Sequence, residues 1–348
     1  MNVNNYYEEL RRVLLNNDFD DIIDADETKK LLKTALLTNR HIILVGPPGC
    51  GKTTLAKNVA KLLPKLELND CPYHCDPKNP VCPECLEKRK KGIKIKTRVF
   101  KGEERFVRVQ GSPDLTVEDL IGDLDPIKAL KFGPSSIQAF TPGKIFKANY
   151  GVLFFDEINR APERIQNALL QVLQEHKITL SGFDVEVPTN FILIATMNPE
   201  DTSTEPLSDV FIDRFDLVPM DYPSTLKEEV RIVKEKGEKL IDFPNKLLVM
   251  IVLFIRELRR SDKLEKKPSV RASIGLYERS QAHALLMGRK RVSLDDVKAV
   301  LNSVIAHRIR FKPSYKFIIK KEDFIREEFN KILSYEDKEL KELMGGSL

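Results

Sequence analysis

A glycine-rich run with one lysine and two threonines stands near the amino end of the sequence, at residues 46–54. Its glycines carry no Cβ, so the backbone can curl and point its N–H groups at phosphate oxygens, aided by the positive end of a following helix. In such a loop the lysine reaches the β- and γ-phosphates of a nucleotide, and the hydroxyl after it binds Mg²⁺. An apolar run, Ile42–Val45, precedes the loop and argues against a chance glycine-rich turn. The predicted nucleoside triphosphate loop consists of Gly46, Pro47, Pro48, Gly49, Cys50, Gly51, Lys52, Thr53 and Thr54.

Two adjacent carboxylates follow a second apolar run about a hundred residues later. Val152–Phe155 is typical of a buried strand in a parallel sheet, and Asp156 and Glu157 come directly after it. Ligands of such sheets bind at the carboxyl ends of the strands. We predict that Asp156 binds Mg²⁺, usually through water, together with Thr53, and that Glu157 polarises the water that attacks the γ-phosphate. Acidic residues also cap helices, but capping does not explain two carboxylates beside a phosphate loop.

Four cysteines form a second candidate site. Cys71, Cys75, Cys82 and Cys85 have the spacing C-x₃-C and C-x₂-C, with six residues between the pairs. Four thiolates this close suit a tetrahedral, structural Zn²⁺ with no open position for catalysis, and nearby prolines stiffen the loop. Two disulfides and free thiols are the alternatives. His74 could replace one cysteine as a ligand.

The order of apolar segments predicts two domains. Strand candidates alternate with helical patterns, which predicts a doubly wound parallel α/β sheet, and helices alone follow Tyr222–Pro223. We expect a nucleotide-binding core at 1–222 with an insertion at 66–100, a helical domain at 223–312 and a helical extension at 313–348. The expected strands are Ile42–Val45, Phe106–Val109, Val152–Phe155, Phe191–Thr196 and Asp216–Pro219, and the expected later helices are Leu226–Lys236, Pro244–Arg260, Arg271–Met287 and Leu294–Arg308.

Composition favours a cytoplasmic protein. The longest apolar run, Leu247–Ile255, is far shorter than the about twenty residues that a membrane span needs, and the polar start, Met1–Arg12, does not resemble a signal peptide. The net charge of +5 among 109 charged side chains is too small to indicate nucleic acid by itself.

A basic run and two expected hairpins leave a nucleic-acid interaction open. The basic run spans Lys88–Arg98, and hairpins are expected to turn at Ser181–Gly182 and at Gly133–Ser136. Basic residues can track phosphates, but no aromatic residues interleave with them to stack on bases. We therefore treat nucleic acid as the less favoured ligand.

Further segments carry a resemblance to a known family. With Ala195–Pro199 and Phe211–Phe215 following the loop and the acidic pair in that order, the chain resembles an AAA+ ATPase over residues 20–312. More narrowly, Asp156–Pro162 is similar to the MoxR ATPases. The segments Ala139–Gly143 and Ala148–Gly151 are similar to the magnesium-chelatase I subunit.

The resemblance implies roles for three more residues. Asn198 matches the asparagine that orients the attacking water, Arg214 matches an arginine finger that serves a neighbouring subunit, and Arg271 matches a sensor in the helical lid. The alternatives are a strand-end turn for Asn198 and surface ion pairs for the arginines. Residues 200–213 depart from the usual chelatase sequence, which leaves the substrate open.

These inferences converge on a Mg²⁺-dependent ATPase with ATP, Mg²⁺ and structural Zn²⁺ as its ligands. The resemblance implies a ring, a hexamer, that remodels a von Willebrand A-type protein or a metal-chelatase complex. A nucleic-acid translocase and a zinc scaffold that binds nucleotide without hydrolysis are the two alternatives.

Overall fold

The computed structural model describes residues 5–180, 185–199, 207–318, 320–335, 339–340, 342 and 344–345. The chain forms two compact units. The first comprises Met1–Ile22, Asp26–Gly46 and Gly51–Met220, and the second comprises Ile23–Ala25, Pro47–Cys50 and Asp221–Leu348.

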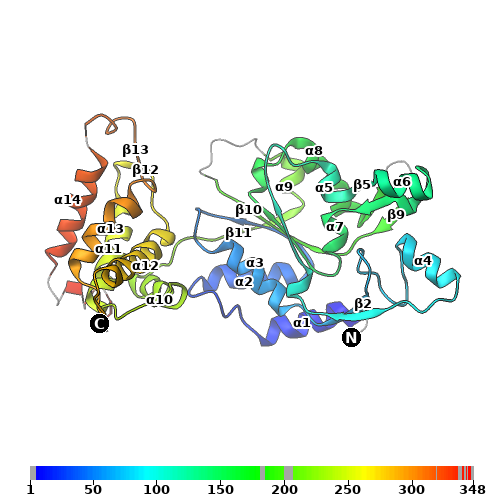
Figure 1. Ribbon diagram of the computed structural model, residues 1–348, viewed down its shortest axis with the longest axis horizontal. Coiled ribbons are helices and arrows are strands. Elements are labelled where there is room, and N and C mark those ends of the chain that lie inside the picture. The colour runs from blue at the N-terminus through cyan, green and yellow to red at the C-terminus, as the bar shows by residue number, and fades with distance from the viewer. Residues whose placement is uncertain are drawn as a thin grey trace. The chain divides into compact units, whose positions relative to one another are not determined.

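A five-stranded parallel sheet is the centre of the first unit (Figure 1). Its strands are β1 (His41–Val45), β4 (Phe106–Gln110), β7 (Val152–Asp156), β10 (Ile192–Met197) and β11 (Phe215–Pro219), in the spatial order β11-β1-β10-β7-β4. The apolar run of β7 is buried on both faces, as a strand covered by helices must be. The predicted parallel α/β sheet and its five strands are thus confirmed.

Helices cover both faces of this sheet. Figure 1 shows α2 and α3 on one side, and α8 and α9 on the other. Their apolar stripes face the strands; α8, for example, buries Ile165, Leu169 and Val172. The helices of this unit are α1 (Tyr6–Asn16), α2 (Asp26–Leu37), α3 (Lys52–Leu62), α4 (Pro83–Lys90), α5 (Val117–Ile121), α6 (Pro126–Phe132), α7 (Lys144–Lys147), α8 (Glu163–Glu175) and α9 (Asp209–Ile212).

Three antiparallel strand pairs extend the first unit. β2 (Leu66–Asn69) pairs with β3 (Thr97–Phe100), and the four cysteines lie between them. β8 (Lys177–Leu180) pairs with β9 (Val185–Pro188) as the alternating pattern predicts, although the expected turn at Ser181–Gly182 lies outside the described residues. The expected tight hairpin at Gly133–Ser136 is wrong. Its flanking strands, β5 (Gly122–Leu124) and β6 (Phe140–Pro142), do pair, but α6 lies between them, because Asp125 caps α6 at Ile127 N and Lys128 N and Pro126 starts it.

The second unit is mainly helical. It contains α10 (Leu226–Lys236), α11 (Asn245–Arg260), α12 (Val270–Leu286), α13 (Leu294–Ile305) and α14 (Lys321–Leu333), with a short pair of strands, β12 (Leu264–Lys266) and β13 (Arg310–Phe311). The apolar run Leu247–Ile255 is buried in its core, on α11. The predicted end of α13 at Arg308 is too late, because the chain turns after Ile305 to bring Phe311 into register with Leu264. Among the described helices, none combines the length and apolar character that a membrane crossing requires.

Candidate nucleotide and metal sites

The glycine-rich loop lies where the sequence predicts it, between β1 and α3. Gly46 N donates to the carbonyl of Met197 at 3.1 Å, so the start of the loop is fixed to the end of β10. Gly49 and Gly51 have φ values of 75° and 110°, which side chains with a Cβ rarely adopt. The Lys52 ammonium donates to the Gly46 carbonyl at 2.6 Å and therefore lies over the loop. Thr53 and Thr54 follow in the first turn of α3, both half-buried. The loop thus fits a phosphate group, because curled backbone, helix start and ammonium meet in one place.

The acidic pair lies at the same edge of the sheet. β10 lies between β1 and β7, with Met197 opposite Val45 and Ala195 opposite Phe155. The carboxyl ends of all three strands therefore come together, where Asp156 is the last residue of β7 and Glu157 follows it.

A threonine on β10 holds both acidic residues. The Thr196 hydroxyl donates to Asp156 Oδ1 at 2.7 Å and accepts from the backbone N–H of Glu157 at 2.8 Å. Glu157 has a left-handed backbone, with φ of 55°, that is unusual for a residue with a side chain. The bond from its N–H stabilises that turn. Sequence reasoning missed Thr196, although it stands next to Met197 and Asn198 in the segment that carries the resemblance.

Three further polar side chains surround the carboxylates and were also not predicted. Arg108 forms an ion pair with Asp156 Oδ2 at 2.6 Å. Gln110 donates to Glu157 Oε2 at 3.0 Å, and Arg160 lies 2.9 Å from the same oxygen. Arg108 and Gln110 are two residues apart on β4, which pairs directly with β7, so they lie on the same face. The available signal was this period-two spacing, on and just after the expected strand Phe106–Val109.

Asn198 and Arg214 lie at opposite edges of the sheet. Asn198 follows β10 directly, so it lies at the carboxyl edge with Lys52 and Asp156. Arg214 precedes β11, whose first residue, Phe215, is opposite His41 at the start of β1. The five-residue strands separate the two edges by about 13 Å. Arg214 is only partly exposed and pairs with Asp213 at 3.0 Å.

Arg271 belongs to the second unit and stands in the first turn of α12. A Cβ built on Gly49 would lie 2.7 Å from Ser269 Oγ and 3.6 Å from Arg271 Cγ, so the tip of the glycine-rich loop lies beside this turn. Arg271 and Arg279 are both close enough to Arg308 to interact with it electrostatically. Burial first, and then these two positive neighbours, lower the pKa of Arg308. Arg271 therefore lies in a positively charged region.

The four cysteines converge as a metal site requires. Their Sγ atoms all lie within 4.8 Å of one another, and none of the thiols is in a disulfide. Tetrahedral Zn²⁺ with four thiolates places the sulfurs about 3.8 Å apart, which this cluster approaches. Backbone N–H groups donate to three of the sulfurs, from Cys75 to Cys71 at 3.4 Å, from Cys82 to Cys75 at 3.3 Å and from Cys85 to Cys82 at 3.4 Å. Such bonds favour thiolate sulfur, so the donor set fits a metal. His74 is not among the converging groups.

Aromatic and amide contacts join the cysteine loop to the core of the first unit. Tyr73, between the first two cysteines, packs against Phe146 with ring centroids 4.8 Å apart. The Asn149 side chain donates to the Tyr73 carbonyl at 3.2 Å and accepts from Asn190 N at 2.6 Å. Asn149 belongs to the segment that resembles chelatase subunits, and here it holds the insertion in place.

Comparisons with known proteins agree with this architecture. Residues 89–217 match the model described as the ATPase family associated with various cellular activities, and residues 256–328 match its lid domain. Residues 18–74 match the model of the magnesium chelatase subunit ChlI. The fold and site thus define an AAA ATPase core followed by its lid.

Comparison with individual relatives indicates which family of AAA ATPases the chain belongs to. The chain is 31% identical to the magnesium-chelatase subunit ChlI homolog of Methanocaldococcus jannaschii over 326 residues, covering 85% of this chain and 86% of that protein. It is 28% identical to the magnesium-chelatase 38 kDa subunit of Acidiphilium rubrum, covering 81% and 87%. A RuvB variant structure from Thermotoga maritima shares the fold, with 20% identity, a TM-score of 0.50 and coverage of 82% and 73%. The chain belongs to the magnesium-chelatase ChlI family of AAA ATPases, which confirms the chelatase half of the predicted resemblance.

Proposed function

We propose that this protein hydrolyses ATP with Mg²⁺ at the carboxyl edge of the central sheet. The observation that carries the proposal is the Thr196 bridge, which orients Asp156 and Glu157 beside the loop that bears Lys52. A phosphate loop without a correctly held carboxylate could bind a nucleotide but would not activate water. Here both parts are present, at the ends of β1 and β7, the two strands that flank β10.

Each residue of the site has a role in this proposal. The loop N–H groups and Lys52 bind the phosphates, while Thr53 and Asp156 would hold Mg²⁺, which supplies positive charge to the β- and γ-phosphates. Glu157 accepts hydrogen bonds from Gln110 and Arg160, which hold its carboxylate at the edge where water would attack. Asn198 orients that water, and Arg271 contacts phosphate from the lid. Arg108 neutralises Asp156 at the oxygen that Thr196 does not bond.

The position of Arg214 supports a shared site. Since Arg214 lies at the amino edge of the sheet, it does not serve the phosphate loop of its own unit. A closed ring of identical subunits would bring the amino edge of one sheet to the carboxyl edge of the next. We infer such a ring, a hexamer by family resemblance, with Arg214 acting on the neighbour's γ-phosphate.

The partner protein is proposed from the family resemblance, and the metal ion is proposed from the cysteine cluster. The names of the relatives support a metal-chelatase complex as the object of remodelling. A von Willebrand A-type protein is the alternative that the family resemblance implies. The cysteine cluster is proposed to bind structural Zn²⁺, because four sulfurs leave no open coordination position. Five free cysteines suit a reducing compartment, in keeping with the expected cytoplasmic location.

Replacement of the catalytic carboxylate tests the hydrolytic proposal. Glu157→Gln should bind ATP with nearly unchanged affinity and lose at least about 10²-fold in kcat, because the amide cannot act as the general base. Glu163→Gln, an exposed change on α8, is the matched control and should keep wild-type turnover. ATP binding by calorimetry and phosphate release with Mg²⁺ measure the two quantities. Undiminished turnover in Glu157→Gln would remove Glu157 from the mechanism.

A further inference from the structure

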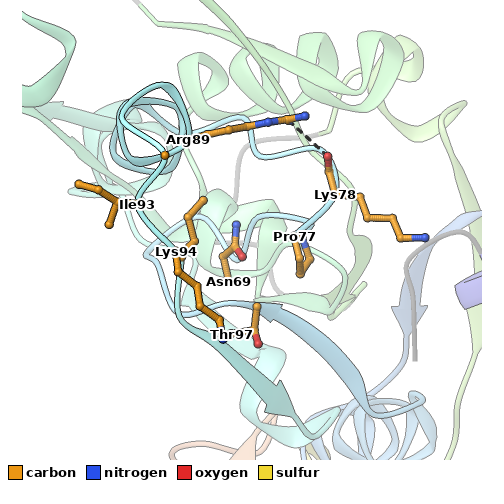
Figure 2. Close-up of a pocket in the computed structure, with 9 residues that line it drawn as sticks. Asn69, Pro77, Lys78, Arg89, Ile93, Lys94 and Thr97 are labelled. Atoms are coloured by element: carbon orange, nitrogen blue, oxygen red, sulfur yellow. Dashed lines mark hydrogen bonds between the residues drawn. The ribbon is translucent and has the colours of Figure 1, made fainter.

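The cysteine insertion carries an open hollow (Figure 2). Its volume is about 420 Å³, and its lining comes from the cysteine loop, the end of α4 and the chain that leads into β3. Its lining includes Asn69, Lys78, Arg89, Ile93, Lys94 and Ile95. None of them takes part in the proposed ATPase site.

Positive charge at this hollow is not compensated within the insertion. Lys78, Arg89 and Lys94 line it, and no carboxylate pairs with them in the described part of the chain. Arg89 instead donates to the backbone carbonyl of Lys78 at 3.3 Å, which fixes the guanidinium at the rim, as Figure 2 shows.

Other cations of the insertion are paired with carboxylates. Lys88 pairs with Glu84, Lys91 with Glu87 and Lys96 with Asp70, at 2.5, 2.5 and 3.2 Å. Within the basic run, these three lysines are thus neutralised by neighbours, whereas Arg89 and Lys94 line the hollow.

A buried acceptor lies at the floor of the hollow. Asn69, at the end of β2, is 1% exposed, and its amide nitrogen donates to Cys85 Sγ at 3.6 Å. Its Oδ1 atom is buried and accepts no hydrogen bond from the described residues. A buried acceptor without a donor costs about 1–3 kcal/mol, so this position favours a ligand that brings an N–H or O–H group.

We propose that the hollow binds an acidic peptide segment of a partner protein. Carboxylates of the segment would pair with Lys78, Arg89 and Lys94, and a backbone N–H would satisfy Asn69. Ile93, which is 52% exposed, and Ile95 offer apolar contacts for aliphatic side chains. A nucleic acid would share the charge complementarity, but no aromatic side chain lines the hollow to stack on its bases.

Neutralising three cations of the hollow, and in a control three cations outside it, tests whether the hollow binds an acidic peptide. The probe is a fluorescein-labelled peptide of alternating glutamate and leucine, with its anisotropy titrated against the full-length protein at low ionic strength. The hollow variant is Lys78→Gln/Arg89→Gln/Lys94→Gln, and the control is Lys88→Gln/Lys91→Gln/Lys96→Gln, which removes the same charge from the same segment. The hollow variant should raise Kd about tenfold, as expected for the loss of three exposed charge pairs, and the control should change Kd less than about twofold.

Three results would overturn the proposal. Equal weakening by both variants would show non-specific attraction, and absence of binding to the wild type would remove the site. Tighter binding of a single-stranded oligonucleotide, lost in the hollow variant alone, would assign the hollow to nucleic acid. Metal content of each variant verifies that the insertion is intact, and Lys94→Gln alone replaces the triple variant if the latter loses metal.

Discussion

At the scale of single residues, the candidate site depends on one buried hydroxyl. Thr196 is 1% exposed and contacts both members of the acidic pair, one through its carboxylate and the other through its backbone. It does not reach the phosphate loop in any described contact. Its contribution is therefore to orientation, and its loss should affect the chemical step rather than nucleotide binding.

Replacing Thr196 distinguishes an effect on the chemical step from an effect on nucleotide binding. Thr196→Val keeps the shape and removes the hydroxyl, so we expect kcat to fall about 10- to 100-fold while the affinity for ATP changes little, since one positioning hydrogen bond to a charged group contributes about 1.5–3 kcal/mol. Thr196→Ser restores the hydroxyl and should recover most of the activity. Steady-state kinetics of both variants measure this, and an equal loss in Thr196→Ser would show that packing matters and that the hydroxyl does not.

At the scale of elements, the sheet and its insertion carry separate candidate sites. The strands β1, β10 and β7 bring together residues that are more than a hundred positions apart, and the antiparallel pair β2–β3 supports the cysteines. We expect the centre of the sheet to tolerate little change, because β1, β10 and β7 are buried over most of their length.

His41, at the start of β1, makes the stability of this sheet depend on pH. Its Nδ1 accepts from Leu193 N at 3.1 Å, and burial, followed by nearby His176 and Arg40, lowers its pKa from 6.5 to about 4. Because the unfolded chain binds the proton more readily than the folded one, stability is full above about pH 6.5 and is lost as pH falls toward 4. We expect amides of β1 and β10 to lose about 2–3 kcal/mol of protection in hydrogen exchange over this range. His41→Gln should remove most of that slope, and an unchanged slope would exclude His41 as its source.

The cysteine insertion is predicted to bind Zn²⁺, and the metal content of the protein tests this. Purified protein should contain about one equivalent of Zn²⁺, and a strong chelator should remove it and increase the proteolysis of residues 66–100, since binding and folding are coupled at such sites. Cys82→Ser should lower the zinc content to a small fraction of the wild-type value, while Cys50→Ser, outside the cluster, should retain it. Intact-mass evidence for two disulfides in place of metal would contradict this.

Sequence information accounts for the elements better than for the polar contacts between them. Continuous apolar runs such as Val152–Phe155 place every strand of the sheet within about one residue, because burial on both faces leaves few other interpretations. Arg108 and Thr196 are different. They contact Asp156 from β4 and β10, the two strands that flank β7 in the sheet. The order of segments along the chain does not reveal this arrangement, since β10 follows β7 in the sequence but lies between β7 and β1 in the sheet. The late end predicted for α13 has a similar cause, because pairing of Phe311 with Leu264 overrides local helical preference.

At the scale of the whole molecule, the proposed ring requires the two edges of the central sheet to carry complementary parts of one site. Glu157 and Lys52 belong to the carboxyl edge, and Arg214 belongs to the amino edge. A single chain therefore cannot complete the site that we propose, whereas a ring supplies each site with both parts. An arginine finger of this kind contributes about 10³- to 10⁵-fold to the rate in other triphosphatases, so isolated chains should be nearly inactive.

Complementation between two inactive variants tests the shared site most directly. Glu157→Gln and Arg214→Ala are co-expressed with different tags and purified through both, and phosphate release is measured with Mg²⁺ and ATP. Each variant alone should be inactive, and randomly mixed rings should regain about a quarter of the wild-type activity, because that share of interfaces combines Glu157 from one subunit with Arg214 from its neighbour. Activity no greater than the sum of the two variants, in rings shown to contain both tags, would contradict the shared site.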